Sequence, residues 1–135
     1  MARPKKVAAP VVVKEPTATK VWTADLIMAW QKKTFPKATV LGQIKKFREE
    51  FKEFIVAKDA GKKRAAMDEL ADMYIVACSL LRLSTSSGLK AMNDFTWLIC
   101  EYGVKFESLQ APINRKMDAN VARKWVYKNG NYHHV

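Results

Sequence analysis

The chain has 135 residues, of which 49% are hydrophobic and 27% are charged, and its formal net charge is +11. This length is typical of one domain with a single hydrophobic core. The longest apolar runs are far shorter than the roughly 20 residues of a membrane span, so we expect no transmembrane helix. We expect a cytoplasmic protein, because its two cysteines are typical of reduced, buried thiols. The positive charge attracts polyanions in general, nucleic acids and nucleotides included, without choosing among them.

The first twenty residues are rich in Lys, Pro and small side chains, and they carry five Lys or Arg against one Glu. Such a segment has too little apolar periodicity to join a core. We therefore predict a disordered basic arm over residues 1–20 and one folded domain over 21–135. We do not expect a signal peptide, because Pro10 interrupts the apolar run and a charged stretch follows where a cleavage site would lie.

Apolar residues that recur every three to four positions predict a series of helices. Thr23 and Thr39 stand at the N-cap positions of the first two, and Gly61 lies in the turn after the second. The third is apolar almost all round from Met73 to Leu83, more than one small bundle can bury, so we expect a partner chain to complete the bundle. The expected bounds are Ala24–Thr34, Val40–Lys58, Arg64–Leu83, Leu89–Leu109 and Asn114–Lys124.

The tail after these helices contains Asn129-Gly130 between strand-prone residues, which is the strongest short signal of a β-hairpin. We therefore predict an all-α helical bundle with an antiparallel central helical hairpin, followed by a short C-terminal β-hairpin or extended tail. Cys78 and Cys100 stand in apolar surroundings with no metal-ligand pattern nearby, so we predict that both are reduced and buried.

Seven of the thirteen acidic residues gather in the predicted helical hairpin. Glu53 and Glu69 are each eight residues from Gly61, and Glu50 and Asp72 are each eleven away. Members of a pair therefore lie at one height on facing helices, and the two levels are about 4.5 Å apart. Glu69 and Asp72 also share the apolar sector of the third helix, where carboxylates are rare unless they are paired or bind a cation. We predict that these four carboxylates bind Mg²⁺, or Mn²⁺ as a substitute; the alternative is a solvated face with Lys partners.

These residues carry a resemblance to a known family. The segment EEFKEF…DELAD gives Glu-Glu-x-x-Glu, fifteen residues, then Glu-x-x-Asp. This pattern resembles the signature of the MazG-like nucleotide pyrophosphohydrolases, the all-α NTP pyrophosphatases. WQKKTFPKATVLGQIKKFREEFKEF and KMDANVARKWVYKNGNYHHV resemble the entry and the ending of bacterial and phage members of the dNTP diphosphohydrolase type. The likeness covers about residues 22–83 and 114–135, and the segment 89–112 departs from it.

The resemblance implies Mg²⁺-dependent hydrolysis of a nucleoside triphosphate, in particular a deoxynucleotide, to the monophosphate and pyrophosphate. It also implies a homodimer or homotetramer, in the host cytoplasm if the protein is phage-encoded. In this reading Glu49 or Glu50 orients or deprotonates the attacking water. Lys116, Asn120 and Arg123 are spaced i, i+4, i+7, so they form one stripe of donors for the triphosphate; the alternative is a solvated basic helix end.

Trp30, Phe35 and Gln43 are candidates for a base pocket, because an aromatic face stacks on a base and an amide reads its edge. Trp30 and Phe35 are equally consistent with core positions. We expect His133 and His134 on the surface. Two other functions remain open: a basic nucleic-acid-binding protein without catalytic activity, which would need a basic stripe uninterrupted by acid, and a phosphoribosyl-ATP pyrophosphohydrolase. Weak non-specific nucleic-acid binding through the arm is compatible with the enzyme as well.

Overall fold

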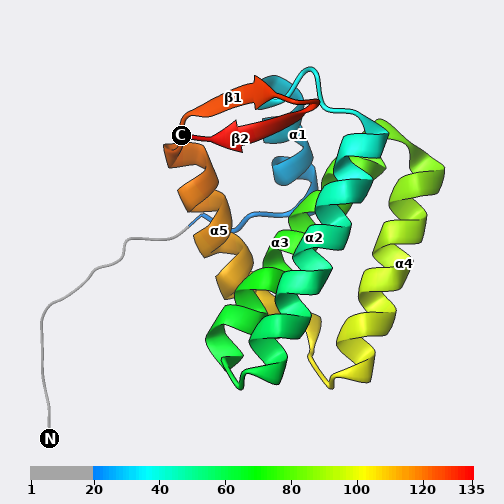
Figure 1. Ribbon diagram of the computed structural model, residues 1–135, viewed down its shortest axis with the longest axis vertical. Coiled ribbons are helices and arrows are strands. Elements are labelled where there is room, and N and C mark those ends of the chain that lie inside the picture. Colours follow the sequence, from blue (N-terminus) through cyan, green and yellow to red (C-terminus); the bar gives the residue numbers. More distant parts are fainter. Residues whose placement is uncertain (1–19) are drawn as a thin grey trace, which may run out of the picture.

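The computed structural model describes residues 20–135, so the predicted basic arm lies, apart from Lys20, outside the described residues. The described chain is a helical bundle with one small β-hairpin (Figure 1), which confirms the predicted fold class. Within it, no helix has the length and apolar character needed to cross a membrane. The elements are α1 Ala24–Thr34, α2 Val40–Asp59, α3 Lys63–Leu83, α4 Thr85–Glu101, η3 Phe106–Leu109, α5 Gln110–Ala122, β1 Trp125–Lys128 and β2 Asn131–His134.

Helix α3 is the centre of the bundle and packs against α1, α2, α4 and α5. Its apolar circumference is therefore buried by the chain's own helices: every residue from Ile75 to Leu80 is buried. The expectation that this helix needs a partner chain to cover it was wrong, because four other helices of the same chain surround it. The tight α2–α3 turn ends at Gly61, whose φ of 72° is accessible to glycine at little cost.

The predicted fourth helix is in fact two elements. Helix α4 begins earlier than expected, because the Ser84 hydroxyl accepts a hydrogen bond from Ser87 N at 3.3 Å and caps it. It ends before Gly103, which has a φ of 68°, and the chain then turns through η3 into α5. Cys100 is exposed while Cys78 is buried, so the prediction that both are buried was wrong for Cys100, which lies outside the buried stripe of α4.

The α3–α4 contact is unusually close at Gly88. A Cβ built on this glycine would lie 2.1 Å from the backbone Cα of Leu81. Only a residue without a side chain fits there, which explains a buried glycine inside a helix.

The C-terminal hairpin has the register predicted by Asn129-Gly130. Both turn residues have positive φ, 54° and 77°, as a two-residue type I′ turn requires. Trp125 pairs with His134 and Lys128 with Asn131. In Figure 1 the hairpin lies across the end of the bundle, beside α1 and the start of α2.

Candidate active site

Three of the four predicted metal ligands meet where α2 faces α3. Glu50 comes from α2, and Glu69 and Asp72 come from α3. One carboxylate oxygen of each lies within 4.8 Å of the corresponding oxygens of the other two. The level pairing of the helical hairpin is what brings them together, since Glu50 and Asp72 are equally far from the turn at Gly61.

The electrostatics of the cluster are those of carboxylates held close together with little water. Glu50 is buried, and its pKa is raised to about 9, first by burial and then by the neighbouring charges of Asp72 and Glu69. Burial also raises the pKa of Glu69 and of Asp72. For Asp72, burial outweighs the opposing charge of Lys116. Carboxylates in such a cluster favour either a shared proton or a bound cation.

The other two predicted acids lie differently. Glu53 is exposed, although it lines the same cavity, and its charge helps to raise the pKa of Glu69. Side chains three residues apart on an α-helix differ in direction by about 60°. Because Glu50 faces α3, Glu53 lies at the edge of that face, where its side chain points toward solvent. Glu49 is exposed and is not among the residues that line the cavity.

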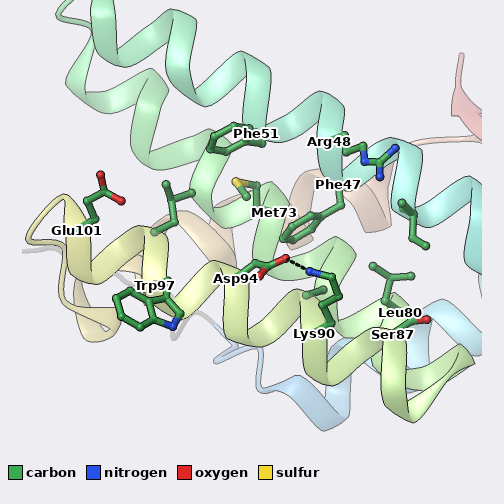
Figure 2. Close-up of a pocket in the computed structure, with 13 residues that line it drawn as sticks. Phe47, Arg48, Phe51, Met73, Leu80, Ser87, Lys90, Asp94, Trp97 and Glu101 are labelled. Atoms are coloured by element: carbon green, nitrogen blue, oxygen red, sulfur yellow. Dashed lines mark hydrogen bonds and ion pairs between the residues drawn. The ribbon is translucent and has the colours of Figure 1, made fainter.

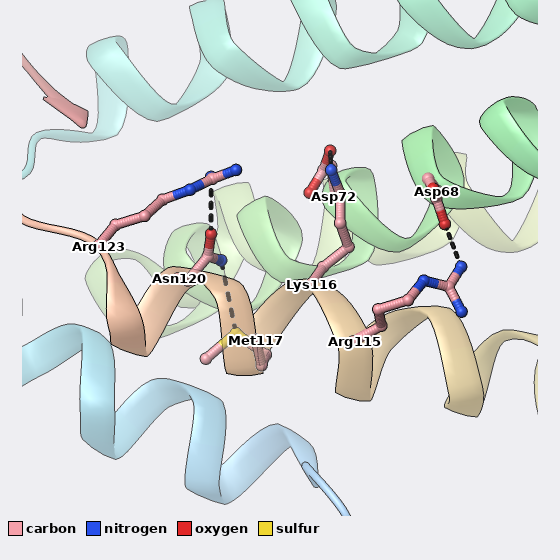
Figure 3. A network of polar contacts seen from close by, with 7 residues as sticks. All are labelled: Asp68, Asp72, Arg115, Lys116, Met117, Asn120 and Arg123. Carbon is pink, nitrogen blue, oxygen red and sulfur yellow. Dashed lines mark hydrogen bonds and ion pairs between the residues drawn. The ribbon is translucent and has the colours of Figure 1, made fainter. Parts of the chain in front are cut away.

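Lys116, Asn120 and Arg123, the predicted donor stripe, all line the cavity, and Figure 3 shows their side chains. Lys116 and Asn120 belong to α5, but Arg123 does not: the helix ends at Ala122 rather than at the predicted Lys124, and Arg123 is its extended, exposed C-cap. Lys116 also contacts the carboxylate cluster: its Nζ lies 3.1 Å from Asp72 Oδ2. Burial alone would lower the pKa of Lys116, but the charge of Asp72 and the contact with it raise the pKa overall. Arg123 donates to Asn120 Oδ1 at 3.3 Å.

A second ion pair of this network could not be read from the sequence. Arg115 of α5 pairs with Asp68 of α3 (Figure 3), beside Lys116 and Asp72. It connects α5 to α3 one position before Lys116. No local pattern relates these two residues, which are 47 positions apart.

The carboxylates and the donor stripe share one cavity of about 270 Å³ with a group of aromatic side chains. Trp30, Phe35 and Gln43 line it, as the base-pocket prediction requires. Trp30 and Phe35 are half-buried, and Trp30 also packs against the hydrophobic core. The hairpin contributes further lining residues that we did not predict: Trp125, Asn131, Tyr132 and His134. His133 and His134 are exposed, as expected.

A larger cavity, about 420 Å³, lies between α2 and α4 and has a different character (Figure 2). Its lining is mostly apolar, with Phe47, Phe51 and Trp97 among its side chains, and it includes none of the three clustered carboxylates. Its chemistry suits a packing partner better than a phosphate.

A comparison with known protein families matches residues 25–116 to phosphoribosyl-ATP pyrophosphohydrolase. The chain belongs to this family. It is therefore a hydrolase of phosphorus anhydrides whose substrate is nucleotide-like, and its family lies within the MazG-like all-α NTP pyrophosphatase superfamily. The match ends at Lys116, before the hairpin. It includes the segment 89–112, which the sequence resemblance did not cover. Neither a curated protein nor a solved structure gives a significant match.

Enzymes of this superfamily generally use a divalent metal ion, and the residues present fit one. Glu50 Oε2 and Glu69 Oε1 are buried and have no hydrogen-bond partner among the described residues. Buried polar atoms are normally satisfied. Three carboxylates form an all-oxygen donor set of the kind that hard divalent cations prefer.

Proposed function

We propose that the chain is a Mg²⁺-dependent nucleoside triphosphate pyrophosphohydrolase, which converts a (d)NTP and water to the (d)NMP and pyrophosphate. The observation that carries this proposal is that one cavity contains carboxylates, cationic donors and aromatic rings. Gln43 and Glu50 are seven residues apart on α2, or about 10.5 Å along its axis. A nucleoside triphosphate likewise separates its base from its phosphates by a ribose. The resemblance favours deoxynucleotides, whose hydrolysis would control their pool.

Glu50, Glu69 and Asp72 would hold the metal ion, with Mn²⁺ as a substitute for Mg²⁺. When bound, it would polarise phosphoryl oxygens and lower the pKa of a water molecule. Glu53, at the rim of the cavity, is the fourth proposed ligand. Of the two residues proposed to orient the attacking water, Glu50 lies in the cavity, whereas Glu49 reaches it only if its side chain moves.

Lys116, Asn120 and Arg123 would bind the phosphates. Charge-assisted hydrogen bonds from Lys and Arg are the strong ones, and they stabilise the charge that grows on the leaving pyrophosphate. The contact of Lys116 Nζ with Asp72 Oδ2 supports a role for its ammonium group between the proposed metal ligands and the phosphates. Arg123, the extended residue that directly follows α5, continues these donors toward the hairpin.

Phosphoribosyl-ATP is the second candidate substrate, because the family match favours it. Both substrates lose pyrophosphate in the same reaction. Phosphoribosyl-ATP carries a second ribose phosphate on its base, which a simple nucleotide lacks. The resemblance of the chain to dNTP-hydrolysing members is what favours the simpler nucleotides.

The test is a panel of dNTPs, NTPs and phosphoribosyl-ATP with Mg²⁺, with the products resolved. Monophosphate plus pyrophosphate from a dNTP supports the proposal. Nucleoside diphosphate plus phosphate would contradict the site of cleavage. Turnover of phosphoribosyl-ATP alone would assign the chain to the second candidate. DNA binding that needs no Mg²⁺, without any nucleotide turnover, would favour the nucleic-acid-binding alternative.

We also propose that the chain forms a homo-oligomer, at least a homodimer, through the α2–α4 groove (Figure 2). Trp97 in this groove is 71% exposed, unusual for so large an apolar side chain. Arg48 lies toward one end of the groove and Glu101 at the other, while Lys90 between them already pairs with Asp94 at 3.2 Å (Figure 2). A second copy packed antiparallel would bring unlike charges together. Trp97→Ser should give a monomer in light scattering; an unchanged mass would exclude this surface.

A further inference from the structure

The C-terminal hairpin is fixed to the base end of the site by specific polar contacts. Tyr132 Oη accepts a hydrogen bond from Lys37 N at 3.0 Å, and Asn131 Nδ2 donates to Gly42 O at 3.1 Å. A Cβ on Gly42 would lie 3.1 Å from Gly130 O, so the absence of a side chain allows the turn to approach α2. The hairpin is therefore a built wall of the cavity.

These contacts determine which way two amides face. The Gly42 carbonyl can only accept, so Asn131 must present its NH₂ group to it. Asn131 Oδ1 then faces Gln43 and accepts from Gln43 Nε2 at 3.3 Å. The carbonyl oxygen of Gln43 is left without a hydrogen bond among the described residues, on a side chain that lines the cavity. One N–H of Gln43 is already engaged by Asn131, while its second N–H and its carbonyl oxygen have no partner among the described residues.

The aromatic residues around this amide do not distinguish bases by themselves. Phe35 lies 5.1 Å from Trp30, 5.1 Å from Trp125 and 4.9 Å from Tyr132, measured between ring centroids. Stacking on such rings tolerates every base, because every base has a π-face. Discrimination at this end therefore depends on hydrogen bonds to the base edge, and Gln43 offers the free acceptor.

We propose that Asn131 is a positioning residue that locks the Gln43 amide and so makes the enzyme prefer amino bases over their oxo counterparts. The inference rests on the proposed function, since it concerns the base end of that site. Because the phosphates are held at the carboxylate end, the base cannot flip over, and the same edge of the base always faces Gln43. A fixed carbonyl accepts from the amino group of cytosine or adenine and faces the lone pairs of an oxo group. A locked amide is therefore selective, whereas a freely rotating amide is not.

Two matched substrate pairs test this: dCTP against dUTP, and dATP against dITP. In each pair an oxo group replaces the amino group, and the adjacent ring nitrogen changes from an acceptor to an N–H donor. The measurement is kcat/KM for each at saturating Mg²⁺. A good pair of hydrogen bonds to a base is worth about 1–3 kcal/mol, or about fivefold to 150-fold. We expect the wild type to prefer the amino member by roughly tenfold or more. Asn131→Ala should bring the ratio to within about twofold, because Gln43 can then rotate.

Asn131→Asp should retain most of the preference, since a carboxylate only accepts and still forces Gln43 to donate its NH₂. Val126→Ala is the control: this residue is on the same hairpin, is 43% exposed and does not line the cavity, so the ratio should not change. A purely structural role for Asn131 would lower the melting temperature and the activity on both members equally.

An unchanged ratio in a folded Asn131→Ala variant would overturn the proposal, and so would a wild type with no preference or an oxo preference. The wild-type ratio decides even if the variant does not fold. If the wild type hydrolyses the amino and oxo members with equal kcat/KM, only this inference fails. If it hydrolyses no nucleotide, the proposed function fails as well.

Discussion

Glu50→Gln should make the metal-free protein more stable near neutral pH and insensitive to Mg²⁺. Glu50 is 8% exposed, and its pKa is raised from 4.5 to about 9, chiefly by burial. In that pH range the folded protein keeps a proton that the unfolded chain releases. The free energy of unfolding therefore falls as the pH rises from about 4.5 to about 9. Glutamine has no proton to lose, so its contribution does not change with pH.

The magnitude follows from the width of that window. One group that is protonated only in the folded state changes stability by up to about 1.4 kcal/mol per pH unit. Between about pH 5 and about pH 7 this amounts to at most roughly 2–3 kcal/mol, and less where Asp72 and Glu69 share the proton. For a domain of this size each kcal/mol moves the melting temperature by about 3–6 °C.

The assay is thermal unfolding followed by circular dichroism, with a chelator and then with Mg²⁺. The wild type should lose several degrees from about pH 5 to about pH 7 in chelator, and Glu50→Gln should lose clearly less. Mg²⁺ should stabilise only the wild type, by about 2.7 kcal/mol at a hundredfold excess over its Kd. Glu49→Gln is the matched control: its carboxylate is exposed, so its curves should follow those of the wild type. Equal pH dependence and equal Mg²⁺ response in wild type and Glu50→Gln would refute the reasoning.

Three further changes address other parts of the structure. Gly88→Ala should destabilise the fold by about 2–3 kcal/mol or more in chemical denaturation, because its Cβ would meet the Leu81 backbone at 2.1 Å; wild-type stability would contradict the α3–α4 contact. Asp72→Asn should abolish turnover with the helical circular dichroism intact, and near-wild-type activity at saturating Mg²⁺ would remove it from the ligands. Arg123→Ala should lower turnover by about thirty- to a thousandfold, corresponding to about 2–4 kcal/mol, without changing Mg²⁺ affinity measured in the absence of nucleotide. Arg123→Lys should restore only part of this, because it lacks the planar fork, and an alanine variant within twofold of wild type would exclude α5 from phosphate binding.

Local signals in the sequence were sufficient for much of the fold. Caps at Thr23 and Thr39 define the starts of α1 and α2, and both side chains accept the expected backbone hydrogen bonds. Asn129-Gly130 predicts the hairpin because few other residues adopt two consecutive positive φ values. The end of α4 was missed because apolar residues continue at helical spacing past it, and only Gly103 marks the change.

The site was predictable to the extent that it depends on helix geometry. Glu50 and Asp72 face each other because both are equally far from Gly61. The exposure of Glu53 depends instead on the direction in which its side chain leaves the helix axis. Contacts made by the hairpin were beyond such reasoning. Asn131 meets Gln43 across 88 positions, and Tyr132 meets Lys37 across 95. No periodicity relates residues so far apart, and only the packed bundle brings them together.

The family match and the cavity do not end at the same place. The match stops at Lys116, yet the cavity continues through Arg123, Trp125 and Asn131. The clustered carboxylates and Lys116 lie within the matched residues, whereas Asn120 and Arg123 lie beyond them. The proposed base end is divided in the same way: Trp30, Phe35 and Gln43 lie within the match, and Trp125, Asn131 and Tyr132 come from the hairpin. In the proposed site the hairpin lines the base end of the cavity, so the choice between a simple nucleotide and phosphoribosyl-ATP depends in part on residues that the family match does not cover.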